Sequence, residues 1–225
     1  MSSSVQTNRY ENMTERFGDL VEKMVNYQCH YQSAIREVQT KLEILDDEFQ
    51  LKHKRNPIHH MQSRLKSMQS IVEKLKRRNL PLTFESLQQS LTDIAGIRVI
   101  CSYIDDIYMI ADLLLSHDDI TLIKKQDYIK APKANGYRSL HLIVNVPIYL
   151  SDGKVMVPVE IQIRTIAMDF WASLEHQLRY KEEAAIPREI SDELLQSAES
   201  IAAIDIKMQS LYNAVNRLEE KETQA

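Results

Sequence analysis

Three short stretches of the sequence gather the residue types that bind nucleotides and metal ions. The first, residues 133–141, holds Gly136, Tyr137, Arg138 and His141 within nine positions, and an apolar run follows it. A glycine lets the backbone turn or approach a ligand closely, so we expect Tyr137 at the entrance of a strand with the cation and the imidazole near it. Taken alone, this stretch is described equally well as an ordinary loop that enters an edge strand.

The other two stretches each contribute a carboxylate from a predicted strand. Asp93 precedes a segment that becomes strand-like by Ile97, and Glu160 lies in the predicted strand 155–163, where it shares one face with Gln162 and Arg164. Two carboxylates that converge from separate strands form a hard oxygen site suited to Mg²⁺, which typically takes one or two carboxylates plus phosphate oxygens. Each acid taken singly is explained better by a surface cap or an ion pair.

A local cationic stretch supplies the last component. Residues 52–78 carry nine lysines and arginines against a single acid, Glu73, although the whole chain has a net charge of −4. Apolar residues at helical spacing predict one helix from about residue 57 to residue 78. A solvated helix face or an RNA-binding surface would use the same cations. Alternatively, one face of this helix can hold a triphosphate through hydroxyls and cations, namely Ser67, Ser70, Lys74 and Arg77.

Together these parts describe a pocket for a metal ion, a polyphosphate and a stacked base. Phosphoryl or pyrophosphoryl transfer is the chemistry that such parts support. With only four glycines the chain has no glycine-rich phosphate loop, which disfavours P-loop and Rossmann folds. No apolar run approaches the roughly 20 residues that span a bilayer, the N-terminus lacks a secretory signal pattern, and the two cysteines form no disulfide framework. We therefore expect a cytoplasmic protein.

The remaining elements follow from hydrophobic periodicity and from turn signals. Further strands are predicted at residues 120–128 and 140–146, and residues 151–154 mark a hairpin turn before the strand 155–163. Helices are predicted at residues 10–51, 82–91, 105–116, 165–180 and 187–218. The last helix carries a heptad-like apolar seam that suits docking on the body or pairing with another subunit: Leu194, Ile201, Ile204, Met208, Leu211, Val215 and Leu218.

Residues 93–98, 135–141 and 159–165 read Asp-Ile-Ala-Gly-Ile-Arg, Asn-Gly-Tyr-Arg-Ser-Leu-His and Val-Glu-Ile-Gln-Ile-Arg-Thr. In this order they resemble the synthetase domain of the (p)ppGpp synthetases of the RelA/SpoT superfamily, and the resemblance extends from about residue 57 to residue 180. Because no hydrolase or regulatory domain is seen, the chain looks like the stand-alone small alarmone synthetases. The resemblance implies an α+β, nucleotidyltransferase-like fold: helices flank a mixed, mostly antiparallel sheet of about five strands, with long N- and C-terminal helices.

The resemblance also implies transfer of the β,γ-pyrophosphate of ATP to the 3′-OH of GDP or GTP, which gives ppGpp or pppGpp and AMP. Asp93 and Glu160 would bind Mg²⁺, and Glu160 could also take the proton from the attacking 3′-OH. Arg64 and Arg98 would sandwich the adenine. The ATP phosphates would be held by Lys66, Ser70, Lys74 and Arg77.

On the acceptor side, the resemblance implies that Tyr137 stacks on the guanine and that Arg138 neutralises the transferred phosphate. Residues 124–127, Lys-Lys-Gln-Asp, match neither of the forms tied to acceptor preference in long family members, so the choice between GDP and GTP stays open. Contacts with the acceptor's phosphates, ribose or base edge are implied for Lys133, His141, Gln162 and Glu175, with Asp169 as a weaker candidate for the base edge.

Residues 59–63 read His-His-Met-Gln-Ser, whereas the RelQ subgroup has Glu-Phe-Val-Thr-Gly, so the chain resembles the RelP subgroup more. We therefore expect activation by the product to be weak or absent. The expected division is a helical extension at residues 1–56, a catalytic domain at 57–182 and a C-terminal helix at 183–225 that mediates a homotetramer. Two alternatives remain open: a nucleotidyltransferase that transfers AMP and releases pyrophosphate, and a non-enzymatic module that binds RNA through the basic face of residues 52–78.

Overall fold

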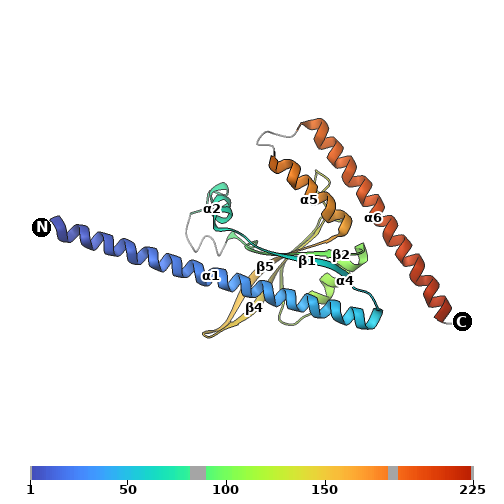
Figure 1. The fold of residues 1–225 in the computed structure, drawn as a ribbon, viewed down its shortest axis with the longest axis horizontal. Helices are drawn as coiled ribbons and strands as arrows, with labels where there is room; N and C mark the ends of the chain where they lie inside the picture. The colour runs from blue at the N-terminus through green and yellow to red at the C-terminus, as the bar shows by residue number, and fades with distance from the viewer. Residues whose placement is uncertain (1, 82–89, 182–186, 224–225) are drawn as a thin grey trace.

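The computed structural model describes residues 2–81, 90–181 and 187–223, and its centre is one sheet (Figure 1). The five strands of this sheet follow the order β1-β2-β5-β4-β3. β2 and β5 run parallel, and the other neighbours are antiparallel. The predicted α+β fold with a mixed, mostly antiparallel sheet is therefore confirmed. The strands are β1 (Ile58–Leu65), β2 (Ala95–Cys101), β3 (Thr121–Asp127), β4 (Leu140–Leu150) and β5 (Gly153–Thr165).

The two faces of the sheet differ in chemistry because successive side chains of a strand point to opposite faces. The odd-numbered residues from Val157 to Ile163 in β5 are buried and apolar, and Ile97 and Val99 in β2 match them. This apolar face packs against α1 (Ser2–His53) and α4 (Ile104–Leu115). The even-numbered residues of β2 and β5, Arg98 and Glu160 among them, turn to the other face.

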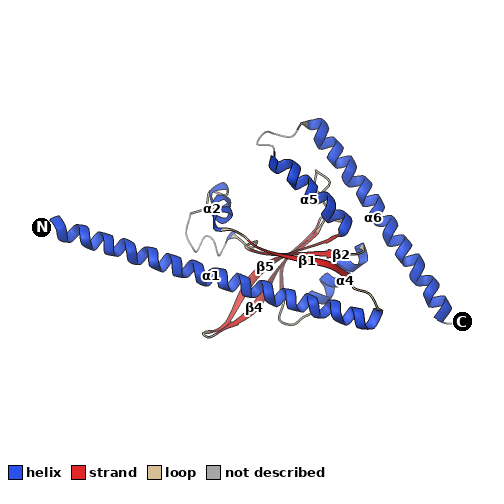
Figure 2. Ribbon diagram, viewed as in Figure 1, coloured by secondary structure: helices blue, strands red, loops and turns tan. Residues whose placement is uncertain are grey.

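Two further helices pack against each other beside the sheet (Figure 2). They are α5 (Ile166–Lys181), which continues directly from β5, and α6 (Arg188–Thr223). Trp171 of α5 is buried, as expected, and its indole Nε1 donates to the main-chain oxygen of Leu194 in α6 at 3.0 Å. The predicted helices at 10–51, 105–116, 165–180 and 187–218 thus correspond to α1, α4, α5 and α6.

The single helix predicted over residues 57–78 is wrong. β1 runs from Ile58 to Leu65, and only then does α2 (Met68–Arg77) begin, with Ser67 as its N-cap. A register shift between Ile58 and His60 explains the error. The extra residue of such a bulge brings positions three apart onto one face of a strand, so Ile58, Met61 and Leu65 contact the core at a spacing typical of a helix.

The helix predicted at residues 82–91 lies outside the described residues except for its last two positions. The predicted hairpin turn is confirmed, because β4 and β5 pair antiparallel up to Leu150 and Gly153. In the described ranges, none of the helices is both long enough and apolar enough to traverse a bilayer.

Candidate functional site

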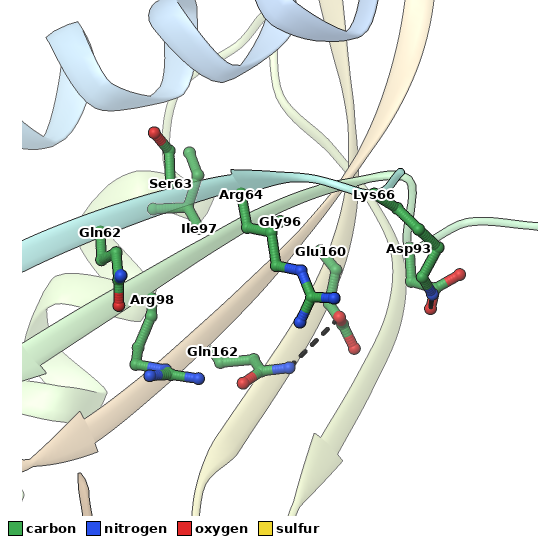
Figure 3. Close-up of a pocket in the computed structure, with 10 residues that line it drawn as sticks. All are labelled: Gln62, Ser63, Arg64, Lys66, Asp93, Gly96, Ile97, Arg98, Glu160 and Gln162. Carbon is green, nitrogen blue, oxygen red and sulfur yellow. Dashed lines mark hydrogen bonds and ion pairs between the residues drawn. The ribbon is translucent and has the colours of Figure 1, made fainter. Parts of the chain in front are cut away.

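A polar cleft of about 440 Å³ lies on the face of the sheet that turns away from the apolar core (Figure 3). Most of its side chains come from β1, β2 and β5. The others belong to the segments that follow β1 and precede β2. The lining residues are Gln62, Ser63, Arg64, Lys66, Asp93, Gly96, Ile97, Arg98, Glu160 and Gln162.

Strand register brings the predicted residues together in two rows across the sheet. Residues directly opposite each other in neighbouring strands place their side chains on the same face. Gly96 pairs with Arg64 on one side and with Glu160 on the other, which makes the first row. The second row, one step along each strand pair, holds Gln62, Arg98, Gln162 and His141.

Arg64 and Arg98 stand diagonally to each other on this face. Gly96 lies between Arg64 on β1 and Glu160 on β5. Because Gly96 has no side chain, the floor of the cleft stays open at this point. Arg98 Nη1 lies 3.6 Å from Asp169 Oδ1, and its buried Nε has no hydrogen-bond partner among the described residues. Two guanidinium groups beside an open floor suit a flat aromatic ring, because arginine stacks well on such rings.

Asp93 lies between two lysines. The main-chain nitrogen of Lys66 donates to the oxygen of Ile94 at 2.9 Å, which fixes the end of β1 against the start of β2. The ammonium of Lys66 then reaches Asp93 Oδ2, and Lys74, from the second half of α2, donates to the same oxygen at 2.5 Å. Burial raises the pKa of Asp93, but the hydrogen bonds from both lysines outweigh it and hold this pKa below its ordinary value.

Glu160 is the second carboxylate of the cleft. Its Oε2 accepts from Gln162 Nε2 at 3.2 Å, and His141 Nδ1 lies 3.5 Å from its Oε1. Burial and the charge of Asp93 raise the pKa of Glu160, whereas the hydrogen bond and charge of His141 lower it, and the net result is a lowered pKa. Glu160 is therefore ionised at neutral pH.

The two carboxylates are suited to a shared divalent cation. Asp93 Oδ1 is buried and has no hydrogen-bond partner within the described parts of the chain, so it is free to act as a ligand. No group of three or more His, Cys, Asp or Glu side chains that could hold a metal occurs in residues 2–81, 90–181 and 187–223. Two carboxylates with ligands completed by phosphate oxygens are typical of Mg²⁺ rather than of a metal caged by protein alone.

Tyr137 is the centre of a second cluster next to the cleft. Its hydroxyl accepts from Arg164 Nη2 at 2.5 Å and lies 2.8 Å from His141 Nε2. Lys133 Nζ lies 4.6 Å from the centre of the Tyr137 ring and 4.7 Å from that of Tyr128. The predicted residues Lys133, Tyr137 and His141 are therefore brought together, and His141 joins them to Glu160.

Other predicted residues lie near these clusters without lining the cleft. Glu175 is buried and accepts from Asn135 Nδ2 at 3.0 Å, which places it beside the loop that carries Tyr137. Ser70 lies one turn before Lys74 on α2, but its hydroxyl accepts from Ser67 at 3.0 Å, and Arg77 is exposed. Arg138 donates to the oxygen of Ile129 at 3.2 Å and does not line the cleft.

Sequence reasoning gave no role to Arg164 and Tyr128. Arg164 is 4% exposed and contacts Tyr137, Gln162 at 2.9 Å and Asp169 at 3.1 Å. Its alternation with Glu160 and Gln162 was the signal that could have identified it, since all three share one face. Tyr128 stands edge-on to both Tyr137 and His141, with ring centres 6.0 and 5.1 Å apart, and no local pattern indicated this contact.

Comparison with known proteins shows the family of the chain. Residues 63–185 match the family model described as the region found in RelA and SpoT proteins. The GTP pyrophosphokinase YwaC of Bacillus subtilis is 46% identical over 186 residues, which cover 83% of this chain and 89% of YwaC.

Two solved structures from the same organism share the fold. Small alarmone synthetase 2 of Bacillus subtilis superposes with a TM-score of 0.77 at 43% identity, covering 85% of this chain and 98% of that one. Small alarmone synthetase 1, in a structure bound to its product pppGpp, has a TM-score of 0.79 at 34% identity and covers 86% and 98% of the two chains.

Proposed function

The chain belongs to the family that carries the region found in RelA and SpoT proteins, and we propose that it is a small alarmone synthetase, a GTP pyrophosphokinase that makes ppGpp or pppGpp. The acceptor 3′-oxygen attacks the β-phosphorus of ATP, the bond to the oxygen shared with the α-phosphate breaks, and AMP leaves. One observation carries this proposal: two arginines, two carboxylates and an aromatic cluster converge on one face of one sheet.

On the donor side, Arg64 and Arg98 hold the adenine over the open floor at Gly96. Lys66 and Lys74 hold the triphosphate. Both ammonium groups contact the same oxygen of Asp93, so the two positive charges lie close together beside the cleft. Phosphate oxygens form charge-assisted hydrogen bonds with such groups, and Ser70 and Arg77 extend the same face of α2.

Asp93 and Glu160 are the residues that would hold Mg²⁺. When bound there, the ion would neutralise phosphate charge and polarise the transferred group. Glu160 accepts the proton of the 3′-OH, and its lowered pKa makes it a weak base. Positioning and charge neutralisation must therefore account for most of the rate.

On the acceptor side, Tyr137 stacks on the guanine, and Glu175 is placed to contact its edge. Lys133 covers the Tyr137 ring at 4.6 Å, so a stacked guanine takes that place and leaves the ammonium free for the acceptor's phosphates. Gln162 and His141 lie in the row that contains Arg98, between the donor and acceptor sides. Arg138, which does not line the cleft, keeps its predicted role only if it turns toward the transferred phosphate.

The RNA-binding alternative is not supported. Residues 52–78 do not form one helical face but belong to the end of α1, to β1 and to α2. Arg55 pairs with Asp106, and Lys66 and Lys74 pair with Asp93. These three cations are therefore held in ion pairs, and the basic residues are spread over separate elements, whereas RNA binding uses a basic patch or stripe on one face.

We propose a homotetramer assembled through α6, in which residues 1–56 extend a catalytic unit at 57–182. The support is an exposed apolar face on the second half of α6, where Ile204, Met208, Leu211, Val215 and Leu218 are each 47–62% exposed. The greater likeness to the RelP subgroup, weak or absent activation by the product, and a cytoplasmic location also remain proposals. If added pppGpp raises the rate severalfold, the prediction about activation is wrong.

The test of the reaction is incubation of the purified protein with γ-labelled ATP, Mg²⁺ and either GDP or GTP, followed by separation of the nucleotides. We expect label in guanosine tetra- or pentaphosphate together with AMP, and the faster acceptor shows the preference. Glu160→Gln should lower the rate by at least about 10²-fold. Released pyrophosphate in place of AMP would indicate a nucleotidyltransferase, and no transfer to either acceptor would refute the proposal.

A further inference from the structure

We propose that the first half of α6 positions the guanine-binding loop, residues 133–139, and that Ala198 is the positioning residue. This inference rests on the proposed function, because that function assigns the loop to the acceptor. α6 contributes none of the residues that line the cleft, so its effect on the reaction must pass through the backbone of the loop.

α6 comes very near the loop at Gly136. This glycine has a φ of +86°, and a Cβ atom added to it would meet the Cβ of Ala198 at 2.5 Å and Cδ1 of Leu195 at 3.2 Å. Real Cβ atoms do not approach other carbons so closely, since dispersion attraction is optimal at about 3.5–4.0 Å. Gly136 therefore serves two needs, a left-handed backbone and direct contact with the surface of α6.

The next residue in the chain, Tyr137, shares this support. It packs against the small cluster of Trp171, Ala172 and Ala198. At the far end of the ring, the hydroxyl is held by Arg164 at 2.5 Å and by His141 at 2.8 Å. The ring is thus fixed at the hydroxyl by the sheet and at the backbone by α6, so a shift of either support changes its direction.

α6 is itself anchored on both sides of Ala198. Before it, the main-chain oxygen of Leu194 accepts from the indole of Trp171. After it, the buried Asp205 accepts from Thr165 Oγ1 at 2.5 Å, and the same hydroxyl accepts from the main-chain nitrogen of Met168 at 3.1 Å. Because Thr165 ends β5, the strand of Glu160 and Gln162, the helix keeps a fixed position relative to both carboxylate and loop.

This arrangement predicts that a larger side chain at position 198 weakens binding of the acceptor nucleotide and leaves binding of ATP unchanged. Ala198→Leu should push the backbone at Gly136 outward and turn Tyr137 away from its position. We expect the KM for GDP and GTP to rise by about tenfold or more, since misplacement by about 1 Å can cost that much. The KM for ATP should change by less than about twofold, because Arg64 and Lys66 lie on β1 and at its end.

Two variants serve as controls. Ala203→Leu adds the same atoms to an exposed position of α6 and should leave both KM values unchanged. Ala198→Ser preserves the size of the side chain and should keep the acceptor KM near that of the unchanged protein. Trp171 is the only tryptophan of the chain and packs in the same cluster as Tyr137, so its fluorescence gives the Kd for GDP without turnover.

A double mutant tests the contact itself. Gly136→Ala should weaken acceptor binding as Ala198→Leu does, and Ala198→Gly in the same chain should restore part of it by removing the opposing Cβ. If Ala198→Gly gives no recovery, or if Ala198→Leu raises the KM for ATP as much as that for the acceptor, the inference is wrong.

Amide hydrogen exchange separates this inference from the proposed function, since it needs no turnover. Exchange of residues 133–139 should be faster in Ala198→Leu than in Ala203→Leu, while residues 155–165 exchange equally in both. Equal exchange of residues 133–139 in the two variants would refute the positioning role even if pyrophosphate transfer is observed. Absence of transfer with faster loop exchange would refute the function and support the positioning role.

Discussion

At the scale of single residues, the cleft combines opposite charges that satisfy each other, and in the proposed function nucleotides would compete for them. One oxygen of Asp93 receives both Lys66 and Lys74 while the other remains without a partner in the described chain. In the proposed function, a Mg²⁺–ATP complex would offer phosphates to the lysines and a cation to the carboxylate in the same event. The same three side chains would then both join β1, α2 and the start of β2 and bind the substrate.

Gly96 gives the most direct test of the donor site. A Cβ at this position would meet only the main-chain oxygen of Arg64, at an ordinary 3.6 Å, so Gly96→Val should fold, and valine suits a strand better than glycine does. Its side chain would occupy the floor between Arg64 and Glu160. We expect the KM for ATP to rise by at least about tenfold, or ~1.4 kcal/mol.

Binding of the acceptor is the control for Gly96→Val. The Kd of this variant for GDP, measured through the fluorescence of Trp171, should stay within about twofold of that of the unchanged protein. Its melting temperature should stay within a few degrees. An unchanged KM for ATP would show that adenine does not lie over Gly96.

His141 should set the pH range in which Glu160 is active. Burial and the charge of Asp93 raise the pKa of Glu160, but the hydrogen bond and charge of His141, together with the hydrogen bond from Gln162, outweigh them, so the net pKa is lowered. A lowered pKa means that activity is kept above it and lost as the pH falls through it. His141→Gln removes the imidazole that lowers the pKa of Glu160, so this pKa should rise. The acid limb of kcat/KM for ATP should therefore move to higher pH.

Tyr137→Phe is the matched control for this profile. It removes the hydroxyl that contacts His141 Nε2 but leaves the imidazole beside Glu160, so its acid limb should coincide with that of the unchanged protein. An acid limb that does not move in His141→Gln would exclude His141 as the group that tunes Glu160.

At the scale of elements, the sequence predicted the parts with strong periodicity and failed where the backbone departs from it. The strands β4 and β5 have regular alternation, so Glu160 and Gln162 could be placed on one face in advance. β1 has a bulge between Ile58 and His60, which makes its apolar spacing look helical. No local signal shows that β1 pairs with β2, and this pairing alone brings Arg64 opposite Gly96.

The contacts between elements could not be predicted from the sequence either. Arg164 reaches the ring of Tyr137 only because the register of β4 and β5 brings the start of one strand beside the end of the other. Gly136 approaches Ala198 although 62 positions of the chain separate them. Such contacts depend on tertiary packing, which a pattern of hydrophobic residues cannot specify. The motif residues themselves were found because each stretch is short and unusual in composition.

The ion pair of Arg55 and Asp106 joins the segment that follows α1 to the first turn of α4. Asp106 is 2% exposed and accepts from Arg55 Nη1 at 3.0 Å and from Nη2 at 2.6 Å. Removing one partner of a buried pair leaves the other charge without compensation, which costs about 3–5 kcal/mol. Asp106→Asn should therefore lower the free energy of unfolding in urea by an amount near ~3 kcal/mol.

Asp105→Asn is the matched control for this change. Asp105 is the neighbouring acid in the first turn of α4, but it is exposed, so both variants lose the same favourable interaction with the helix dipole, about 0.3–1 kcal/mol. Equal losses in the two variants would show that the pair with Arg55 contributes nothing beyond that interaction.

At the scale of the whole molecule, the heptad-like apolar residues of α6 fall into two groups, one packed against the body and one exposed. Leu194 and Ile201, in its first half, pack against the cluster that supports Tyr137. Asp205 and Gln209 continue on the buried side, whereas Ile204 and Met208 turn away from the body. Docking on the body therefore accounts for the first residues of the heptad-like pattern, and the proposed pairing with another subunit would use different residues of the same helix.

The exposed part of this seam should hold copies of the chain together. Met208 and Val215 are 47% and 52% exposed, and burying such side chains contributes about 1.5–3 kcal/mol each. Met208→Glu with Val215→Glu places two charges in that face and should convert the proposed tetramer to smaller species, as measured by light scattering after gel filtration. Ala203→Glu with Ser210→Glu, also seven apart and exposed, is the matched control and should leave the mass unchanged. At 100° per helical residue, these two positions lie about 100–120° from the middle of the exposed apolar face. If the first half of α6 positions the guanine-binding loop as proposed, loss of assembly should also raise the KM for GDP while that for ATP stays constant. If the mass is unchanged in the first variant, the subunits meet elsewhere.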